Sequence, residues 1–192
     1  MWNWFHRLGA PRSFFEMTGR WLPWLSAASL LTIGVGTAWA LLFAPADYQQ
    51  GESVRIMYVH VPTSILAQSS YMMMATAAAV FLIWRIKLAD IALQCIAPIG
   101  ASITALALIT GSLWGKPMWG TWWVWDARLT STLVLLFLFI GVMALRSAME
   151  NRPAAGRATA ILAVVGVINL PSMTFQFTWW NTLHQSSRLT LT

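Results

Sequence analysis

Apolar residues are gathered in five long runs along the chain, separated by short polar segments. A helix needs about 20 consecutive apolar residues to cross the hydrocarbon core of a bilayer. The pattern therefore predicts an all-α fold, a polytopic membrane helix bundle with five transmembrane helices at residues 21–43, 62–84, 91–113, 129–145 and 158–177. Pro98 and Pro171 lie inside the third and fifth runs, and each predicts a kink.

Composition supports a protein integral to the membrane. Hydrophobic residues make up 58% of the 192 residues and charged residues only 9%, whereas soluble domains carry about 25% charged residues. The net charge of +6 does not indicate a nucleic-acid partner, because the cations stand at the ends of apolar runs and not in one patch. With Cys95 as its single cysteine, the chain has no internal disulfide and no C-x-x-C-H motif for attaching haem to itself.

The distribution of lysine and arginine predicts the orientation. Eight of these residues fall on the side of the N-terminus and four on the opposite side, so the N-terminus is expected in the cytoplasm. We predict a cytoplasmic or interfacial arm at residues 1–20 and a single transmembrane domain at residues 21–192. Three segments would then emerge together on the outer face, at about residues 44–61, 114–128 and 178–192.

The most unusual of these segments reads WGKPMWGTWWVWD. It holds five tryptophans, Trp114, Trp119, Trp122, Trp123 and Trp125. Tryptophan often forms a belt at the membrane interface, but this density also suits a flat aromatic surface for a large planar ligand. Lys116-Pro117 predicts a break in any helix through the segment. Asp126 is expected to cap the fourth helix, to contact a ligand or partner, or both.

Two histidines are expected on the same face as the tryptophans. His60 precedes Pro62, which suits the first turn of a helix, so His60 is expected just outside the second span and at the surface. His184 follows the fifth span. Either could be an ordinary interfacial residue. Two histidines are too few for zinc, which takes about four ligands, but haem iron needs only two axial ones.

Cations on this face would suit the two propionates of haem. They are Arg55, Lys116, Arg128 and Arg188, and each could equally be a boundary residue whose charge reaches toward water. Enzymatic activity is not expected. Residues 111–117 miss the phosphate-binding loop pattern by one residue of spacing and by a proline in place of serine or threonine.

Residues 119–126 (WGTWWVWD) resemble the tryptophan-rich WWD signature of haem-handling proteins in cytochrome c biogenesis. Within that group, the chain is similar from end to end to the haem exporter protein C family. The further similar stretches are 43–51 (FAPADYQQG), 60–62 (HVP), 114–118 (WGKPM), 127–131 (ARLTS) and 179–185 (WWNTLHQ).

The resemblance implies a multi-pass protein of the bacterial inner membrane that holds haem b at the periplasmic face and promotes its transfer to a periplasmic haem chaperone. His60 and His184 would be the axial ligands of the iron. The five tryptophans and Asp126 would form the platform, with Arg55 and Arg128 beside it. The implied partners are the chaperone, a small single-span accessory protein and the ATPase and permease subunits of an ABC transporter.

The family usually has six spans, whereas this sequence ends at Thr192 after five. Its C-terminal segment is therefore expected on the outer face. Two other functions remain open. The chain could be a transporter that moves haem through its own spans, or a scaffold that docks the chaperone and the ABC transporter without binding haem.

Overall fold

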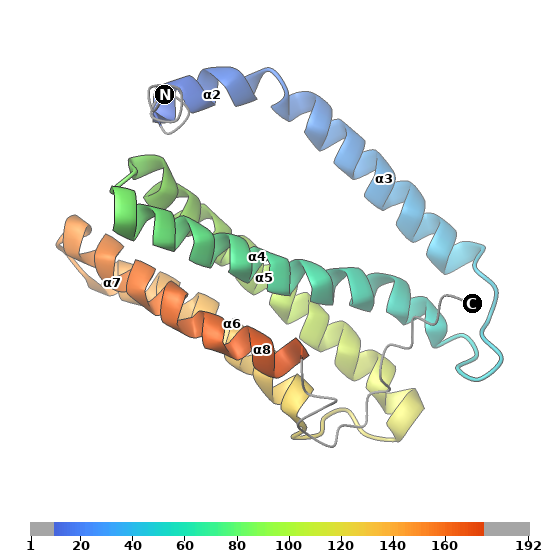
Figure 1. The fold of residues 1–192 in the computed structure, drawn as a ribbon. Coiled ribbons are helices and arrows are strands. Elements are labelled where there is room, and N and C mark those ends of the chain that lie inside the picture. The colour runs from blue at the N-terminus through green and yellow to red at the C-terminus, as the bar shows by residue number, and fades with distance from the viewer. Residues whose placement is uncertain (1–9, 175–192) are drawn as a thin grey trace, which may run out of the picture.

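The computed structural model describes residues 10–174, which are almost entirely helical (Figure 1). The elements are α2 (Pro11–Gly19), α3 (Leu22–Leu42), α4 (Val54–Trp84), α5 (Lys87–Trp119), α6 (Ala127–Ala148), α7 (Arg152–Val165), the 3₁₀-helix η1 (Gly166–Ile168) and α8 (Asn169–Thr174). Within residues 10–174, five stretches are long and apolar enough to cross a membrane: α3, α4, α5, α6 and Arg152–Met173. The predicted all-α polytopic membrane fold is confirmed.

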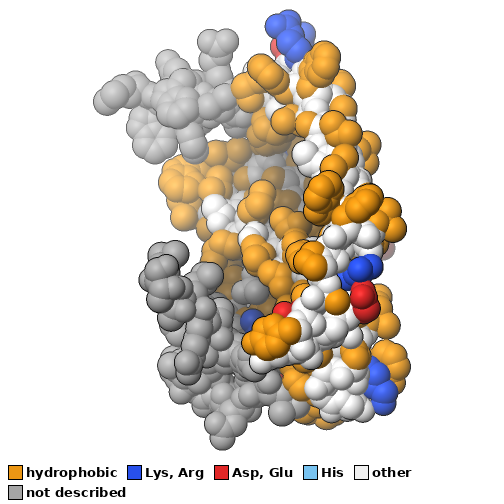
Figure 2. Space-filling model, turned by 90° about the vertical axis from the view of Figure 1, so that its right-hand side faces the viewer, with side chains coloured by type: hydrophobic (Ala, Val, Ile, Leu, Met, Phe, Trp, Pro, Cys, Tyr) orange, Lys and Arg blue, Asp and Glu red, His pale blue; other side chains and the backbone are white. Residues whose placement is uncertain are grey.

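Helices α4 to α8 form a bundle, and α3 stands apart from it (Figure 1). Ala40 is the one buried residue of α3, and its apolar side chains are exposed on all sides, as suits a helix surrounded by lipid. Figure 2 shows hydrophobic side chains spread over the described surface, with charged side chains in a few small groups. The outside of the bundle is therefore a surface for lipid.

Small residues bring the bundle helices close together. The core contains alanines from α4, α5 and α7 packed around Tyr71, Met74, Leu135 and Phe139. At Gly100 of α5 the ring of Phe139 occupies the space that a side chain would fill, and Tyr71 meets the same ring edge-on at 5.2 Å. Helices in lipid associate by this kind of close van der Waals packing.

Helix α4 begins eight residues earlier than the proline pattern predicts. It starts at Val54 and carries Pro62 in its interior. The hydroxyl of Thr63 donates to the carbonyls of Val59 and His60, each at 2.9 Å, so a side chain supports the turn that Pro62 weakens. The prediction that Pro62 opens the helix is wrong, because the surrounding turn tolerates the missing N–H.

The predicted break at Lys116-Pro117 is also wrong. Helix α5 continues to Trp119, and it ends at Gly120, which has the left-handed φ of 78° that glycine adopts without strain. It also passes through Pro98 without interruption. In the fifth span, by contrast, η1 interrupts the α-helix and ends three residues before Pro171, which fits the irregularity expected near a residue that cannot donate a backbone hydrogen bond.

The two ends of the bundle differ in chemistry. One end, which we call the Asp90 end, joins α4 to α5 and α6 to α7. There Arg146 of α6 donates to both carboxylate oxygens of Asp90 of α5, at 2.7 and 2.8 Å. The opposite end, which we call the His60 end, contains the starts of α4 and α6 and the end of α5. His60 and the tryptophan segment therefore share one end, as predicted.

The packing at Gly100 predicts that a substitution with alanine changes stability in the direction opposite to the usual one. Replacing glycine with alanine inside a helix normally stabilises it by up to about 1 kcal/mol. We expect Gly100→Ala to destabilise the protein instead, by about 1–3 kcal/mol, because the added methyl meets Phe139. The measurement is thermal unfolding of the two proteins in detergent.

Gly34→Ala is the matched control, because nothing lies within 4 Å of a methyl group at that position of α3. It should leave the unfolding temperature unchanged or raise it. Equal effects of the two substitutions would contradict the packing described for α5 and α6.

Candidate functional site

A cavity of about 370 Å³ opens at the His60 end. We call it the His60 cavity. Its walls come from α4, α5, α6, α8 and the loop that joins α3 to α4, and its lining includes Gln50, His60, Gln68, Trp114, Trp119 and Arg128. Its volume lies within the range of about 300–1,000 Å³ typical of small-molecule sites. The lining combines aromatic rings, a cation and an imidazole.

His60 lies in the second turn of α4 and is half-buried, so the prediction that it stands outside the span is corrected. Its Nδ1 is 3.1 Å from the carbonyl oxygen of Ala107 and 3.2 Å from the hydroxyl of Thr110. A carbonyl only accepts hydrogen bonds, so Nδ1 carries the proton and donates it. Nε2 of the neutral ring then has its lone pair available, which is the state that binds a metal.

Gly111 of α5 makes this arrangement of His60 possible. A methyl group at residue 111 would lie 2.8 Å from Cε1 of the imidazole and 3.4 Å from its Nδ1. Only a residue without a side chain lets the ring approach α5 closely enough to reach the carbonyl of Ala107. The glycine thus sets the position of the histidine.

Two of the five tryptophans line the His60 cavity. Trp114 is buried, at 9% exposure, and Trp119 meets it edge-to-face with ring centroids 4.9 Å apart and planes at 82°. Both lie in the last turns of α5, which the sequence did not predict to be helical. The indole N–H of Trp114 donates to the side-chain oxygen of Gln50 at 3.0 Å, which ties the loop between α3 and α4 to the cavity wall.

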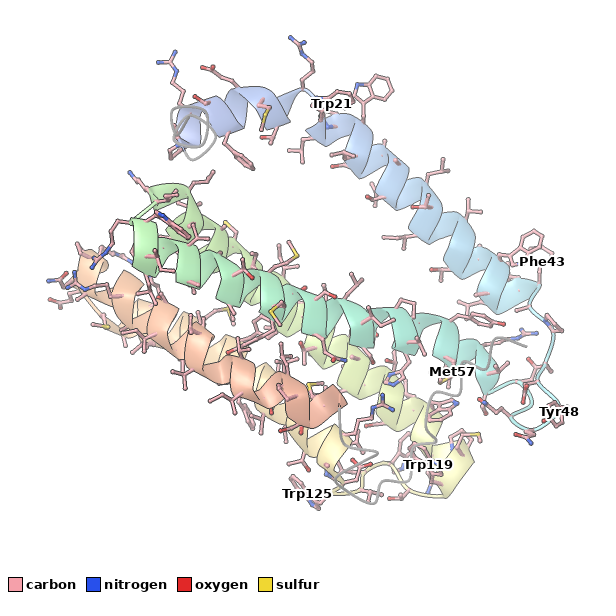
Figure 3. The ribbon with its side chains drawn as sticks, in the orientation of Figure 1. Trp21, Phe43, Tyr48, Met57, Trp119 and Trp125 are labelled. Carbon is pink, nitrogen blue, oxygen red and sulfur yellow. The ribbon has the colours of Figure 1, made fainter. Side chains whose placement is uncertain are left out.

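The other three tryptophans lie in the loop between α5 and α6. Trp122 is 55% and Trp125 74% exposed, and Trp123 and Trp125 meet edge-on at 77°. None of the three lines the His60 cavity. Figure 3 shows Met57 and Trp119 at the same end of α4 and α5, with Trp125 at the foot of α6. With pairs set near right angles, the five rings do not form the single flat surface that was expected.

Asp126 and the cations occupy different positions. Asp126 caps α6, where its carboxylate accepts the backbone N–H of Leu129 at 2.8 Å. Arg128 lines the cavity. Arg55 instead donates to the carbonyls of Leu41 and Ala44 and pairs with Glu52, so it fastens the end of α3 to the start of α4. Lys116 donates to the carbonyl of Gly120 at 2.9 Å.

His184 and Arg188 lie outside the described residues. Within residues 10–174, no group of three or more histidine, cysteine, aspartate or glutamate side chains could hold a metal ion. His60 can therefore contribute one ligand to an iron that already has the four nitrogens of a porphyrin. The described part of the site supplies that nitrogen, two aromatic rings and one cation.

Three residues of the site were missed from the sequence. Gly111 and Thr110 position the imidazole, and Gln50 contacts Trp114. The spacing of small residues along α5, at Ala97, Gly100, Ala107 and Gly111, was an available signal for a face of close helix approach. Nothing local pairs Gln50 with Trp114, because the two are 64 positions apart.

Comparison with known proteins shows the family of the chain. The family model described as heme exporter protein C matches residues 4–192. The heme exporter protein C of Escherichia coli K12 is 54% identical over 187 residues, which cover 97% of this chain and 76% of that protein. The protein of that name from Haemophilus influenzae is 50% identical over 99% of this chain and 77% of its own length. That of Rhodobacter capsulatus is 43% identical over 94% and 75%.

These bacterial relatives and the five membrane-length helices identify a multi-pass protein of the bacterial inner membrane. The family match covers nearly the whole chain, including both the His60 cavity and the tryptophan segment. The chain belongs to the heme exporter protein C family.

Proposed function

We propose that this protein binds haem b at the periplasmic face of the inner membrane and passes it to a periplasmic haem chaperone during cytochrome c maturation. His60 is one axial ligand of the iron, and His184 is the other. The observation that carries the proposal is the hydrogen bond from Nδ1 of His60 to the carbonyl of Ala107. It orients the ring and leaves Nε2 for the iron.

The surroundings of His60 suit a haem. Trp114 and Trp119 offer aromatic surface to the porphyrin, and Arg128 offers a positive charge to a propionate. No aspartate or glutamate is among the described residues that line the cavity. Bound haem supplies the iron and its four ring nitrogens, while the protein supplies axial nitrogens, aromatic contact and charge.

The charge distribution supports a periplasmic site. Of the described lysines and arginines, three lie at the His60 end, namely Arg55, Lys116 and Arg128. Seven lie at the Asp90 end or in the preceding arm, namely Arg12, Arg20, Arg85, Lys87, Arg146, Arg152 and Arg157. Because positive residues favour the cytoplasmic side, the cavity faces the periplasm and the N-terminus the cytoplasm.

The exposed tryptophans are better placed to take part in haem transfer to the chaperone than in binding haem inside the cavity. Trp122 and Trp125 lie outside the cavity with more than half of their surface exposed. Exposed aromatic residues at one edge of a site are typical of protein interfaces. We assign Trp122, Trp123 and Trp125 to the side from which the chaperone reaches the haem. A single-span accessory protein and the ABC transporter subunits complete the proposed complex.

The axial ligands can be tested by the visible absorption of the purified protein. We expect wild-type protein to carry low-spin haem with two histidine ligands. His60→Ala and His184→Ala should each remove the low-spin signal or the haem itself, because each removes one axial nitrogen. His6→Ala, which changes a histidine in the N-terminal arm, is the control and should keep the wild-type spectrum. Wild-type protein without haem would favour the scaffold function.

A second substitution tests the position of the imidazole without removing it. Gly111→Ala places a methyl group against the His60 ring, so we expect a weakened or altered low-spin spectrum. Gly141→Ala is the matched control in α6, because its methyl would make only an ordinary contact with Leu162 at 3.6 Å, away from the histidine and the cavity. A Gly111→Ala protein with the wild-type spectrum would show that the contact with α5 does not position the ligand.

The division between tryptophans predicts different defects. Trp119→Ala should weaken haem binding about 2- to 10-fold, in line with an aromatic contact worth about 0.5–1.5 kcal/mol. Trp125→Ala should keep haem binding near the wild-type value and slow haem transfer to purified chaperone. Both are measured by titration and by following the appearance of haem on the chaperone. The reverse pattern would overturn the assignment.

A further inference from the structure

Gln50 is fixed against the wall of the His60 cavity by a contact that spans the fold. Its side-chain oxygen accepts the indole N–H of Trp114 at 3.0 Å. Gln50 belongs to the loop between α3 and α4, whereas Trp114 belongs to α5. Both residues line the cavity together with His60 and Arg128. The contact therefore brings a side-chain amide from a distant loop to the edge of the proposed haem site.

The bond to Trp114 determines which way the amide faces. An indole nitrogen donates and never accepts, so the atom that meets it must be the amide oxygen. The NH₂ group of Gln50 is then the other arm of the amide. Among residues 10–174, this NH₂ group donates no hydrogen bond to another residue. Two N–H donors with a defined direction are left at the cavity wall.

The loop that carries Gln50 is itself held in place. The carboxylate of Asp47 accepts the backbone N–H groups of Gln49 and Gln50, both at 2.8 Å. Asp47 and Gly51 exchange two backbone hydrogen bonds across the turn, at 3.2 and 2.8 Å. Arg55 fastens the preceding residues through the carbonyls of Leu41 and Ala44. The amide therefore needs little ordering when a ligand arrives.

The remaining chemistry of the cavity points to the kind of group that this amide meets. Arg128 contributes a guanidinium to the same cavity, and its described lining contains no carboxylate. An amide NH₂ and a guanidinium that line the same cavity are donors suited to an anion with several acceptor oxygens, such as a carboxylate. We propose that Gln50, oriented by Trp114, is a specificity residue that donates to a propionate carboxylate of the bound porphyrin. This inference rests on the proposed function.

Gln50 offers an oxygen that accepts from Trp114 and an NH₂ group that can donate to a ligand, and different substitutions remove these two functions. Gln50→Glu keeps an oxygen to accept the indole N–H of Trp114 but replaces the donors with a negative charge. Gln50→Leu removes both the acceptor and the donors. A purely structural role depends only on the acceptor, so it predicts that Gln50→Glu is harmless. A role in carboxylate recognition predicts that Gln50→Glu weakens binding of a porphyrin with free carboxylates and spares one whose carboxylates are esterified.

The experiment titrates two porphyrins into the haem-free full chain in detergent and follows absorption. One is iron protoporphyrin IX, and the other is its dimethyl ester, in which both carboxylates are neutral. We expect Gln50→Glu to weaken binding of the free acid about 10- to 100-fold, the scale of a lost hydrogen bond to a charged group. Binding of the ester should stay within about 3-fold of wild type, which also shows that the variant is folded.

Gln68→Glu is the matched control, because Gln68 lines the same cavity and its substitution adds the same charge away from Trp114. It should discriminate less between the two porphyrins. If both variants weakened binding of the free acid relative to the ester by the same factor, the cause would be the added negative charge in the cavity, and the inference would be overturned. So would a Gln50→Glu protein that binds both porphyrins as wild type does. Wild-type protein that binds neither porphyrin would instead refute the proposed function itself.

Discussion

The close approach of α4 to α5 is the constraint on which the rest of the site depends. Small residues on α5 allow it, and at Gly111 the missing side chain is replaced by the imidazole of His60. The same approach brings Nδ1 within 3.1 Å of the carbonyl of Ala107. Helix packing and the orientation of the imidazole are therefore one feature. Any change that separates the two helices would also break the hydrogen bond that orients the imidazole.

Hydrogen bonds that would be minor in water matter more at this depth. An unpaired polar group in a bilayer costs several kcal/mol, so polar side chains here are held by nearby carbonyls. Thr63 supports the turn before Pro62, and Thr110 donates to the carbonyl of Leu106 at 2.8 Å while its oxygen faces His60. The long α4, about 46 Å at 1.5 Å per residue, exceeds a core of about 30 Å. Its first turns can thus stand at the membrane boundary with His60.

The membrane-spanning fold could be predicted from the sequence because lipid imposes a simple rule on length and apolarity. The shared end of His60 and the tryptophans followed from the number of spans alone. The errors arose at Pro62 and Pro117, where a local penalty was overcome by the surrounding turns. The contacts of Gly111 and Gln50 were missed because each depends on a partner brought close only by folding. Local sequence patterns do not indicate which distant residues come into contact.

The tryptophan segment divides at Gly120, and this division has a functional logic. Before Gly120, Trp114 and Trp119 are held by the helix and turned to the cavity; after it, Trp122 and Trp125 are exposed. A protein that passes on its ligand must hold one side of that ligand and leave another side accessible. For the haem transfer that we propose, a site buried on all sides would hold haem too firmly, and an open platform would lose it to the membrane. A helix that ends halfway through the segment provides both conditions in thirteen residues.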